Sequence, residues 1–168
     1  MVQLRLKYAT GGELLLAARA LVAALPVPVI VNDRADIALA AGAAGVHLGV
    51  DDLPVAAVRA MAPAGFIVGA SFGSEAELAH AKDADYVGIG PIHGTASKAD
   101  AGEAIGTGGF ARLRRMIAAP AVAIGGVDAS NAAALREAGA EGIAVIRALF
   151  GASDPESAAR RLREGFGA

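Results

Sequence analysis

The sequence contains no cysteine and no tryptophan, and aromatic residues make up only 4% of its 168 residues. The lack of cysteine excludes a disulfide scaffold, a thiolate nucleophile and a thiolate zinc site. The formal net charge is only −2, so there is no electrostatic basis for binding nucleic acid or an anionic membrane surface. Hydrophobic residues make up 55% of the chain, which excludes intrinsic disorder.

Long apolar runs are also lacking. The longest, from Ala20 to Val31, contains two prolines and is shorter than the roughly 20 residues that cross a bilayer. The N-terminal segment Met1–Lys7 alternates apolar and polar residues, unlike a signal peptide. We therefore expect a cytoplasmic protein without a membrane partner.

Short β-branched segments alternate with helix-like Ala/Leu/Glu/Arg segments along the whole chain. This alternation predicts parallel strands joined by crossover helices. The expected strands are Met1–Lys7, Val27–Asn32, Gly45–Leu48, Phe66–Ser71, Tyr86–Pro91, Ala121–Gly125 and Gly142–Ile146. The expected helices are Glu13–Leu25, Leu53–Met61, Glu75–Lys82, Gly109–Ile117, Ser130–Glu137 and Pro155–Phe166.

Nearly all chemically interesting side chains follow these strands. In parallel α/β folds ligands bind at the carboxyl ends of strands, so we expect the side chains to face one common site. Because every strand ends in this way, we expect an α/β fold of the TIM (β/α)8-barrel type, formed as one domain over residues 1–168. A doubly wound sheet is the alternative, but the G-x-G-x-x-G signature after the first strand is absent.

Acidic residues follow two neighbouring strands, at Asp33 and at Asp51-Asp52. Two carboxylates at adjacent strand ends can share Mg²⁺, which prefers one or two carboxylates completed by water and phosphate oxygens. The alternative is a helix cap before Leu53-Pro54, which we expect of Asp51. Asp33 has no helix to cap in this way, so it is the stronger candidate for a metal ligand.

Three later segments are candidate phosphate sites. Thr95-Ala96-Ser97-Lys98 offers two hydroxyls, backbone N–H groups and one ammonium, although a solvated loop would have the same composition. Gly125-Gly126 and Ile146-Arg147 end the last two expected strands. In barrels a phosphate often binds to backbone N–H groups there, and paired glycines allow the close approach. A simple tight turn is the alternative for the two glycines.

The first strand has polar residues at Gln3, Arg5 and Lys7, which would share one face by alternation. Inside a barrel such a face is costly unless a ligand meets it. His47, His80 and His93 lack the spacing of metal ligands. We expect His47 in the core and His80 on a helix surface, and we assign no role to His93.

Taken together, the motifs resemble the thiamine phosphate synthase family, which includes the thiazole tautomerases. The resemblance covers Val2 to about Ala159 and rests on six segments in the right order. They are Val2–Lys7, Val31–Arg34, Gly45–Gly49 with Asp51–Pro54, Gly88–Ile92 with Thr95–Lys98, Ala123–Val127, and the last strand.

The resemblance implies a reaction and a set of roles. The reaction joins hydroxymethylpyrimidine diphosphate to thiazole phosphate, giving thiamine phosphate and pyrophosphate. Metal ligation of Mg²⁺ is implied for Asp33 and Asp52. Catalytic roles are implied for Lys98, Arg5, Asn32 and Ser71. Substrate contacts are implied for Gln3, Arg5, Lys7, Asn32, Ser71, Thr95, Ser97, Lys98, Gly125, Gly126, Ile146 and Arg147.

The sequence also departs from the family pattern. Leu6 stands where Glu is usual, Val50 where Gln is usual, and Arg147 where a small hydroxyl residue is usual. The strand and helix that precede the segment of Val2 in the family are missing, so we expect a barrel short of its first βα unit. Its unpaired edge strands would favour a homo-oligomer.

The resemblance leaves two alternative functions open. The first is a thiazole tautomerase, although Gly73 stands where those enzymes have His. The second is a phosphate-ligand binder without catalysis, because the short N-terminus could impair activity.

Overall fold

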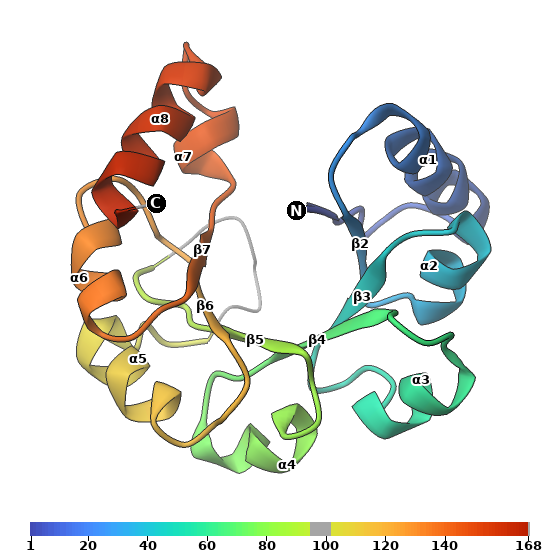
Figure 1. Ribbon diagram of the computed structural model, residues 1–168, viewed down its shortest axis with the longest axis horizontal. Coiled ribbons are helices and arrows are strands. Elements are labelled where there is room, and N and C mark those ends of the chain that lie inside the picture. The colour runs from blue at the N-terminus through green and yellow to red at the C-terminus, as the bar shows by residue number, and fades with distance from the viewer. Residues whose placement is uncertain (95–101, 168) are drawn as a thin grey trace. The chain divides into compact units, whose positions relative to one another are not determined.

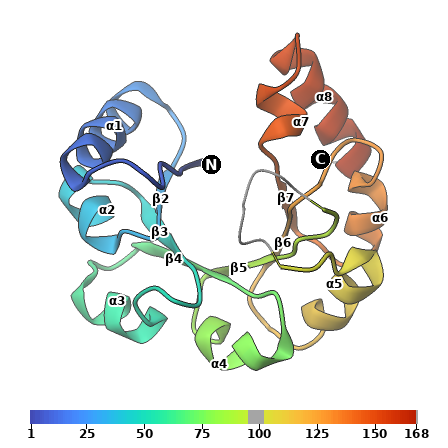
Figure 2. The ribbon, with the colours of Figure 1, turned by 180° about the vertical axis from the view of Figure 1, so that it is seen from behind.

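Parallel strands followed by helices repeat along the part of the chain that the computed structural model describes, residues 1–94 and 102–167. The contacts within the chain define two units, Met1–Ser71 with Asp83–Asp85 and Phe72–Lys82 with Tyr86–Ala168. Figures 1 and 2 show the elements of each unit from opposite sides.

The first unit contains four strands, β1 (Val2–Leu4), β2 (Val29–Asn32), β3 (Gly45–Leu48) and β4 (Ile67–Ser71). Each pairs in parallel with the next, and the register places Asn32 opposite His47 and His47 opposite Gly69. The helices α1 (Gly11–Ala24), α2 (Ala35–Ala41) and α3 (Val55–Met61) lie on one side of these strands (Figure 1).

Burial and capping explain these elements. Val29, Ile30 and Val31 are all buried, as the strands of a parallel sheet covered on both faces should be. Helix α1 begins with a capping box, in which Thr10 and Glu13 exchange hydrogen bonds between side chain and backbone. Helix α2 ends at Gly42, whose φ of 68° allows the left-handed turn into β3.

The second unit contains the strands β5 (Tyr86–Ile89), β6 (Ala121–Ile124) and β7 (Gly142–Ala144), again parallel and in chain order. Its helices are η1 (Glu75–Glu77), α4 (Leu78–Ala81), α5 (Gly106–Arg114), α6 (Ala132–Glu137), α7 (Arg147–Phe150) and α8 (Pro155–Phe166). Helix α8 packs against α6 and α7 and buries Leu162 and Phe166.

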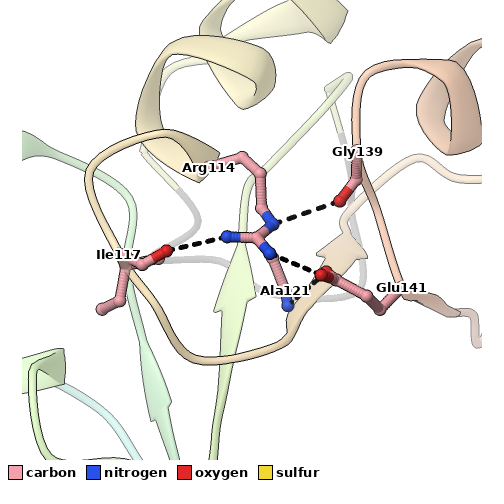
Figure 3. Close-up of polar contacts among 5 residues, drawn as sticks. All are labelled: Arg114, Ile117, Ala121, Gly139 and Glu141. Carbon is pink, nitrogen blue, oxygen red and sulfur yellow. Dashed lines mark hydrogen bonds and ion pairs between the residues drawn. The ribbon is translucent and has the colours of Figure 1, made fainter.

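In the second unit, the side chain of Arg114 on α5 links the helix to the segments before two strands (Figure 3). The Arg114 guanidinium donates to the carbonyls of Ile117 at 2.7 Å and Gly139 at 3.2 Å and pairs with Glu141 at 2.5 Å. The other oxygen of Glu141 accepts from the Ala121 N–H at 2.8 Å. These contacts tie the end of α5 to the starts of β6 and β7.

The first unit repeats this arrangement with other residues. Arg59 of α3 donates to the Phe66 carbonyl at 2.9 Å and pairs with Asp85 at 2.6 Å. Asp85 accepts from the Val68 N–H at 2.7 Å, and its own N–H donates to the Val68 carbonyl. We call each set, Arg59–Asp85 and Arg114–Glu141, an arginine–acid clamp.

The expected strands are all present in the described residues, mostly shorter by one or more residues at the ends. Helices α2 and α7 were not predicted. Asp51 does not cap α3, because Pro54 stands at its N-cap without a side-chain bond. Over the described residues, no helix combines the length and apolar character of a membrane span.

Candidate active site

Strand β2 ends in a strained turn centred on Asp33. The Arg34 N–H donates to the Asn32 carbonyl at 2.8 Å, and the φ of Asp33 is 65°. A three-residue turn with positive φ at its centre is the rare, strained form of the γ-turn. Asp33 is the single non-glycine residue with positive φ in the described chain. Backbone strain of this kind gathers at functional sites.

A second carboxylate faces Asp33. The Asp52 Oδ2 atom accepts from the Gly49 N–H at 2.6 Å, which fixes that carboxylate just after β3. Burial raises the pKa of Asp33, and the negative charge and hydrogen bond of Asp52 raise it further. Lys7 and Arg5 oppose this increase in the pKa of Asp33. Two carboxylates and two cations therefore lie together at the carboxyl ends of the first unit's strands.

These two carboxylates could hold a divalent cation. No cluster of three or more His, Cys, Asp or Glu side chains suited to a metal occurs in residues 1–94 and 102–167. A two-carboxylate donor set fits Mg²⁺, which keeps water and takes phosphate oxygens as its remaining ligands. It does not fit a structural zinc site, which needs four protein ligands.

Strand β1 is shorter than expected, which changes how its polar residues are placed. The strand ends at Leu4, so alternation along a strand does not extend to Arg5 and Lys7. The positive charges of both residues nevertheless oppose the increase in the pKa of Asp33. Gln3 is exposed on the strand itself.

Polar side chains also end β2 and β4. Asn32 and Ser71 are half-buried final residues of their strands. His47 in the middle of β3 is buried, as expected, and its Nε2 atom lies 3.3 Å from the Ser71 Oγ. His80 lies on α4, and its Nε2 atom is buried without a hydrogen-bond partner within the described residues.

In the second unit, the two glycines after β6 form the turn. Their φ values are 78° for Gly125 and 70° for Gly126. A Cβ atom would lie 2.7 Å from Pro91 Cβ at the first position and 2.7 Å from His93 Cβ at the second. Asn131 Nδ2 donates to the Gly126 carbonyl at 3.0 Å. Glycine is therefore required at both positions, because conformation and space each exclude a side chain.

Two residues beside this turn were missed as site candidates. His93 is exposed next to Gly126, and its charge is among the influences on Asp128. The pKa of Asp128 is lowered, first by the hydrogen bonds from Ser130. Asn131, and not Asp128, holds the N-cap position of α6. In the sequence, the only signal for His93 and Asp128 as site residues is that each follows an expected strand.

The other predicted residues are placed as follows. Ile146 is 52% exposed, and Arg147 begins the short helix α7. Leu6 and Val50 are exposed, each close to the first unit's charged residues in sequence. Thr95, Ser97 and Lys98 lie outside the described residues.

Within each unit, parallel strands carry helices on one side and polar residues at their carboxyl ends, which defines an α/β protein of the TIM-barrel type. Comparison with known proteins narrows this class. The thiamine monophosphate synthase family model matches residues 1–149. The chain belongs to this family, and it is an enzyme of the transferase class.

Individual relatives agree with this assignment. The thiamine-phosphate synthase of Azorhizobium caulinodans is 51% identical, over 97% of this chain and 79% of that protein. The one of Methanoculleus marisnigri is 46% identical, over 100% of this chain and 82% of that protein. A solved thiamine phosphate pyrophosphorylase from Pyrococcus furiosus is 36% identical with a TM-score of 0.83, over 98% of this chain and 81% of that one.

Proposed function

We propose that this chain condenses hydroxymethylpyrimidine diphosphate with thiazole phosphate in a Mg²⁺-dependent reaction that gives thiamine phosphate and pyrophosphate. The observation that carries the proposal is the Asp33–Asp52 pair with Arg5 and Lys7 beside it. Two carboxylates that can hold a cation, with two positively charged side chains beside them, suit a diphosphate better than an uncharged ligand. The names of the relatives support the product.

In this proposal the carboxylates of Asp33 and Asp52 hold Mg²⁺. The cation would stabilise the negative charge that builds on the leaving pyrophosphate. Arg5 and Lys7 bind the same diphosphate from the side of β1, and Lys98 adds a third positive charge. The charges of Arg5 and Lys7 lie beside the two carboxylates before any substrate binds, so they would stabilise the leaving group with little reorganisation.

The proposed bond changes are a substitution at the pyrimidine methylene carbon. Its C–O bond to the diphosphate breaks, and the electron pair leaves with pyrophosphate. The lone pair of the thiazole nitrogen then forms the C–N bond, which leaves the ring as a thiazolium cation. Gln3, Asn32 and Ser71 hold the pyrimidine in place, so that the second step needs only correct placement.

The thiazole phosphate is assigned to the second unit's residues. The turn at Gly125 and Gly126 brings bare backbone close to a ligand. Thr95 and Ser97 are assigned hydroxyl contacts to this phosphate. Ile146 and Arg147, which follow β7, are assigned further contacts to the same substrate. Arg147 would add charge to the phosphate contact.

The direct test is to incubate the purified chain with both substrates and to measure thiamine phosphate by chromatography. We expect product with Mg²⁺ and none after EDTA treatment, with recovery when Mg²⁺ is restored. A folded chain that makes no product would refute the proposal. Isomerisation of a thiazole phosphate would indicate a tautomerase, and thermal stabilisation by substrates without product would indicate a binding protein.

A further inference from the structure

His47 is the buried polar residue of the described core, with 7% of its surface exposed. It stands in the middle of β3, between β2, which ends at Asn32 just before Asp33, and β4, which ends at Ser71. Its backbone carbonyl accepts the Asp33 N–H at 2.8 Å, and its ring Nε2 lies 3.3 Å from the Ser71 Oγ. One residue thus contacts both neighbouring strand ends.

The sheet register explains how the ring reaches Ser71. His47 is opposite Asn32 on β2 and opposite Gly69 on β4. Residues opposite each other in a parallel pair point to the same face, and Ser71, two residues beyond Gly69, points to that face too. Gly69 has no side chain to occupy the space beside the imidazole. The ring can therefore lean along β4 to the serine hydroxyl.

We propose that His47 is a positioning residue for the reaction, which acts by holding the Ser71 hydroxyl in one orientation toward the pyrimidine substrate. The inference rests on the proposed function, in which Ser71 binds that substrate. A serine hydroxyl rotates freely unless a partner directs it, and imidazole nitrogen can direct it as acceptor or as donor. Fixing this rotation before the substrate arrives removes an entropic cost of binding and of reaction.

The test is a double-mutant cycle that combines His47→Leu with Ser71→Ala. We expect His47→Leu alone to lower kcat/KM for the pyrimidine diphosphate roughly five- to tenfold, the contribution of one neutral hydrogen bond. The KM for the thiazole phosphate should not change. In the Ser71→Ala background the same substitution should change kcat/KM less than about twofold, because its target is gone.

Two further variants separate positioning from packing. In His47→Gln the side-chain amide reaches about as far as Nε2, so this variant should recover most of the lost kcat/KM. His80→Leu replaces a histidine on α4 that has no assigned role in the reaction, and should leave kcat and KM unchanged. If His47→Leu does not fold, His47→Asn takes its place, since its shorter amide does not extend to Ser71.

Calorimetric binding of thiamine phosphate to the same variants gives a readout without turnover. The wild-type chain can make product while the effects of His47→Leu and Ser71→Ala on turnover and on binding simply add in the double variant. That result overturns the role of His47 and leaves the proposed function standing. Failure of the Gln variant to recover activity also overturns that role. A wild-type chain that neither makes nor binds thiamine phosphate overturns both proposals.

Discussion

At the scale of single residues, the site depends on placing the Asp52 carboxylate where it disfavours the negative charge of Asp33. Asp33 is held in a strained turn and has a raised pKa, because burial and the nearby Asp52 both oppose its ionisation. This arrangement costs stability in the absence of a cation. Such a cost fits the proposed role of the pair in binding a cation, since functional sites tolerate strain that the rest of a fold does not.

The adjacent acids Asp51 and Asp52 allow a matched comparison. Asp52 contacts Gly49 and acts on the Asp33 charge, whereas Asp51 is exposed. We expect Asp52→Asn to lower kcat/KM by roughly 100-fold or more, the scale of losing one preorganised electrostatic contact. Asp51→Asn should stay within about twofold of the wild type. Steady-state kinetics at saturating Mg²⁺ measures both, and equal losses would refute the metal assignment.

The raised pKa of Asp33 predicts a pH-dependent gain in stability for Asp33→Asn. A carboxyl with a raised folded-state pKa destabilises the fold once the pH exceeds its unfolded pKa, and costs nothing below it. The metal-free variant should therefore melt at a Tm equal to or above that of the wild type at pH 7, while losing Mg²⁺-dependent turnover. The Tm advantage should disappear below the ordinary carboxyl pKa.

Asp36 provides a control, because its pKa is shifted in the opposite direction to that of Asp33. Its pKa is lowered, first by the hydrogen bond from Arg34, which pairs with it at 2.6 Å. Asp36→Asn should lower the Tm slightly at pH 7, because an exposed ion pair contributes about 1 kcal/mol at most. That loss should fade as the pH falls through the lowered pKa of Asp36. A Tm decrease for both variants at pH 7 would refute the account of Asp33.

At the scale of elements, each unit is held by an arginine–acid clamp. In both clamps the arginine comes from the preceding helix and the acid stands directly before a later strand. The acid replaces a backbone partner by accepting from a strand N–H, at Val68 in one clamp and at Ala121 in the other. The clamps lie at the starts of strands, so their role is stability, whereas the proposed chemistry lies at the ends.

Arg114 and Arg112 on α5 form a matched pair for testing the clamp. Arg114 bonds two carbonyls and Glu141, whereas Arg112 makes a 3.6 Å pair with exposed Glu75. Arg114→Met should lower the free energy of unfolding by about 1–3 kcal/mol, because it leaves acceptors without partners. Arg112→Met should change it by less than about 0.5 kcal/mol. Urea unfolding measures the difference, and equal effects would contradict a structural role for the clamp.

The Arg114→Met loss should also depend on pH. Burial favours a higher pKa for Glu141, but hydrogen bonds from Arg114 and the Ala121 N–H lower it overall. A lowered folded-state pKa stabilises the fold above the unfolded pKa, and this stabilisation is lost as the pH falls through the folded value. The gap between wild type and variant should therefore narrow in acid.

At the scale of the whole molecule, binding should stabilise the chain by linkage. Ligands that bind only the folded state raise the Tm, and saturation at 100 times Kd contributes about 2.7 kcal/mol. If Asp33 and Asp52 share a cation with a diphosphate, pyrophosphate and Mg²⁺ together should raise the Tm more than the sum of their separate effects. Differential scanning fluorimetry measures these Tm shifts. The part of the joint shift that exceeds the sum of the separate shifts should be lost in Asp52→Asn and kept in Asp51→Asn. Additive shifts in the wild type would refute a shared site.

Local patterns were enough to predict much of this protein. The alternation of strand and helix segments predicted β3 and α8 at their observed bounds. Both depend on local signals, because the spacing of apolar residues and the capping residues lie within each segment. The residues Asn32, Asp33, Asp52 and Ser71 could be singled out because polar side chains at strand ends are unusual next to buried strands. Helix α2 was missed because its seven residues, mostly alanine and leucine, carry no clear helical period.

The sequence by itself determined which residue types stand at the carboxyl end of each strand, since that follows from the order of short local patterns. Only the tertiary structure decided the positive φ of Asp33, its pairing with Asp52, the contact between His47 and Ser71 and the two arginine–acid clamps. The reason is physical. The contacts among these features join residues that are distant in the chain, and their geometry depends on strand register and on the burial that register creates.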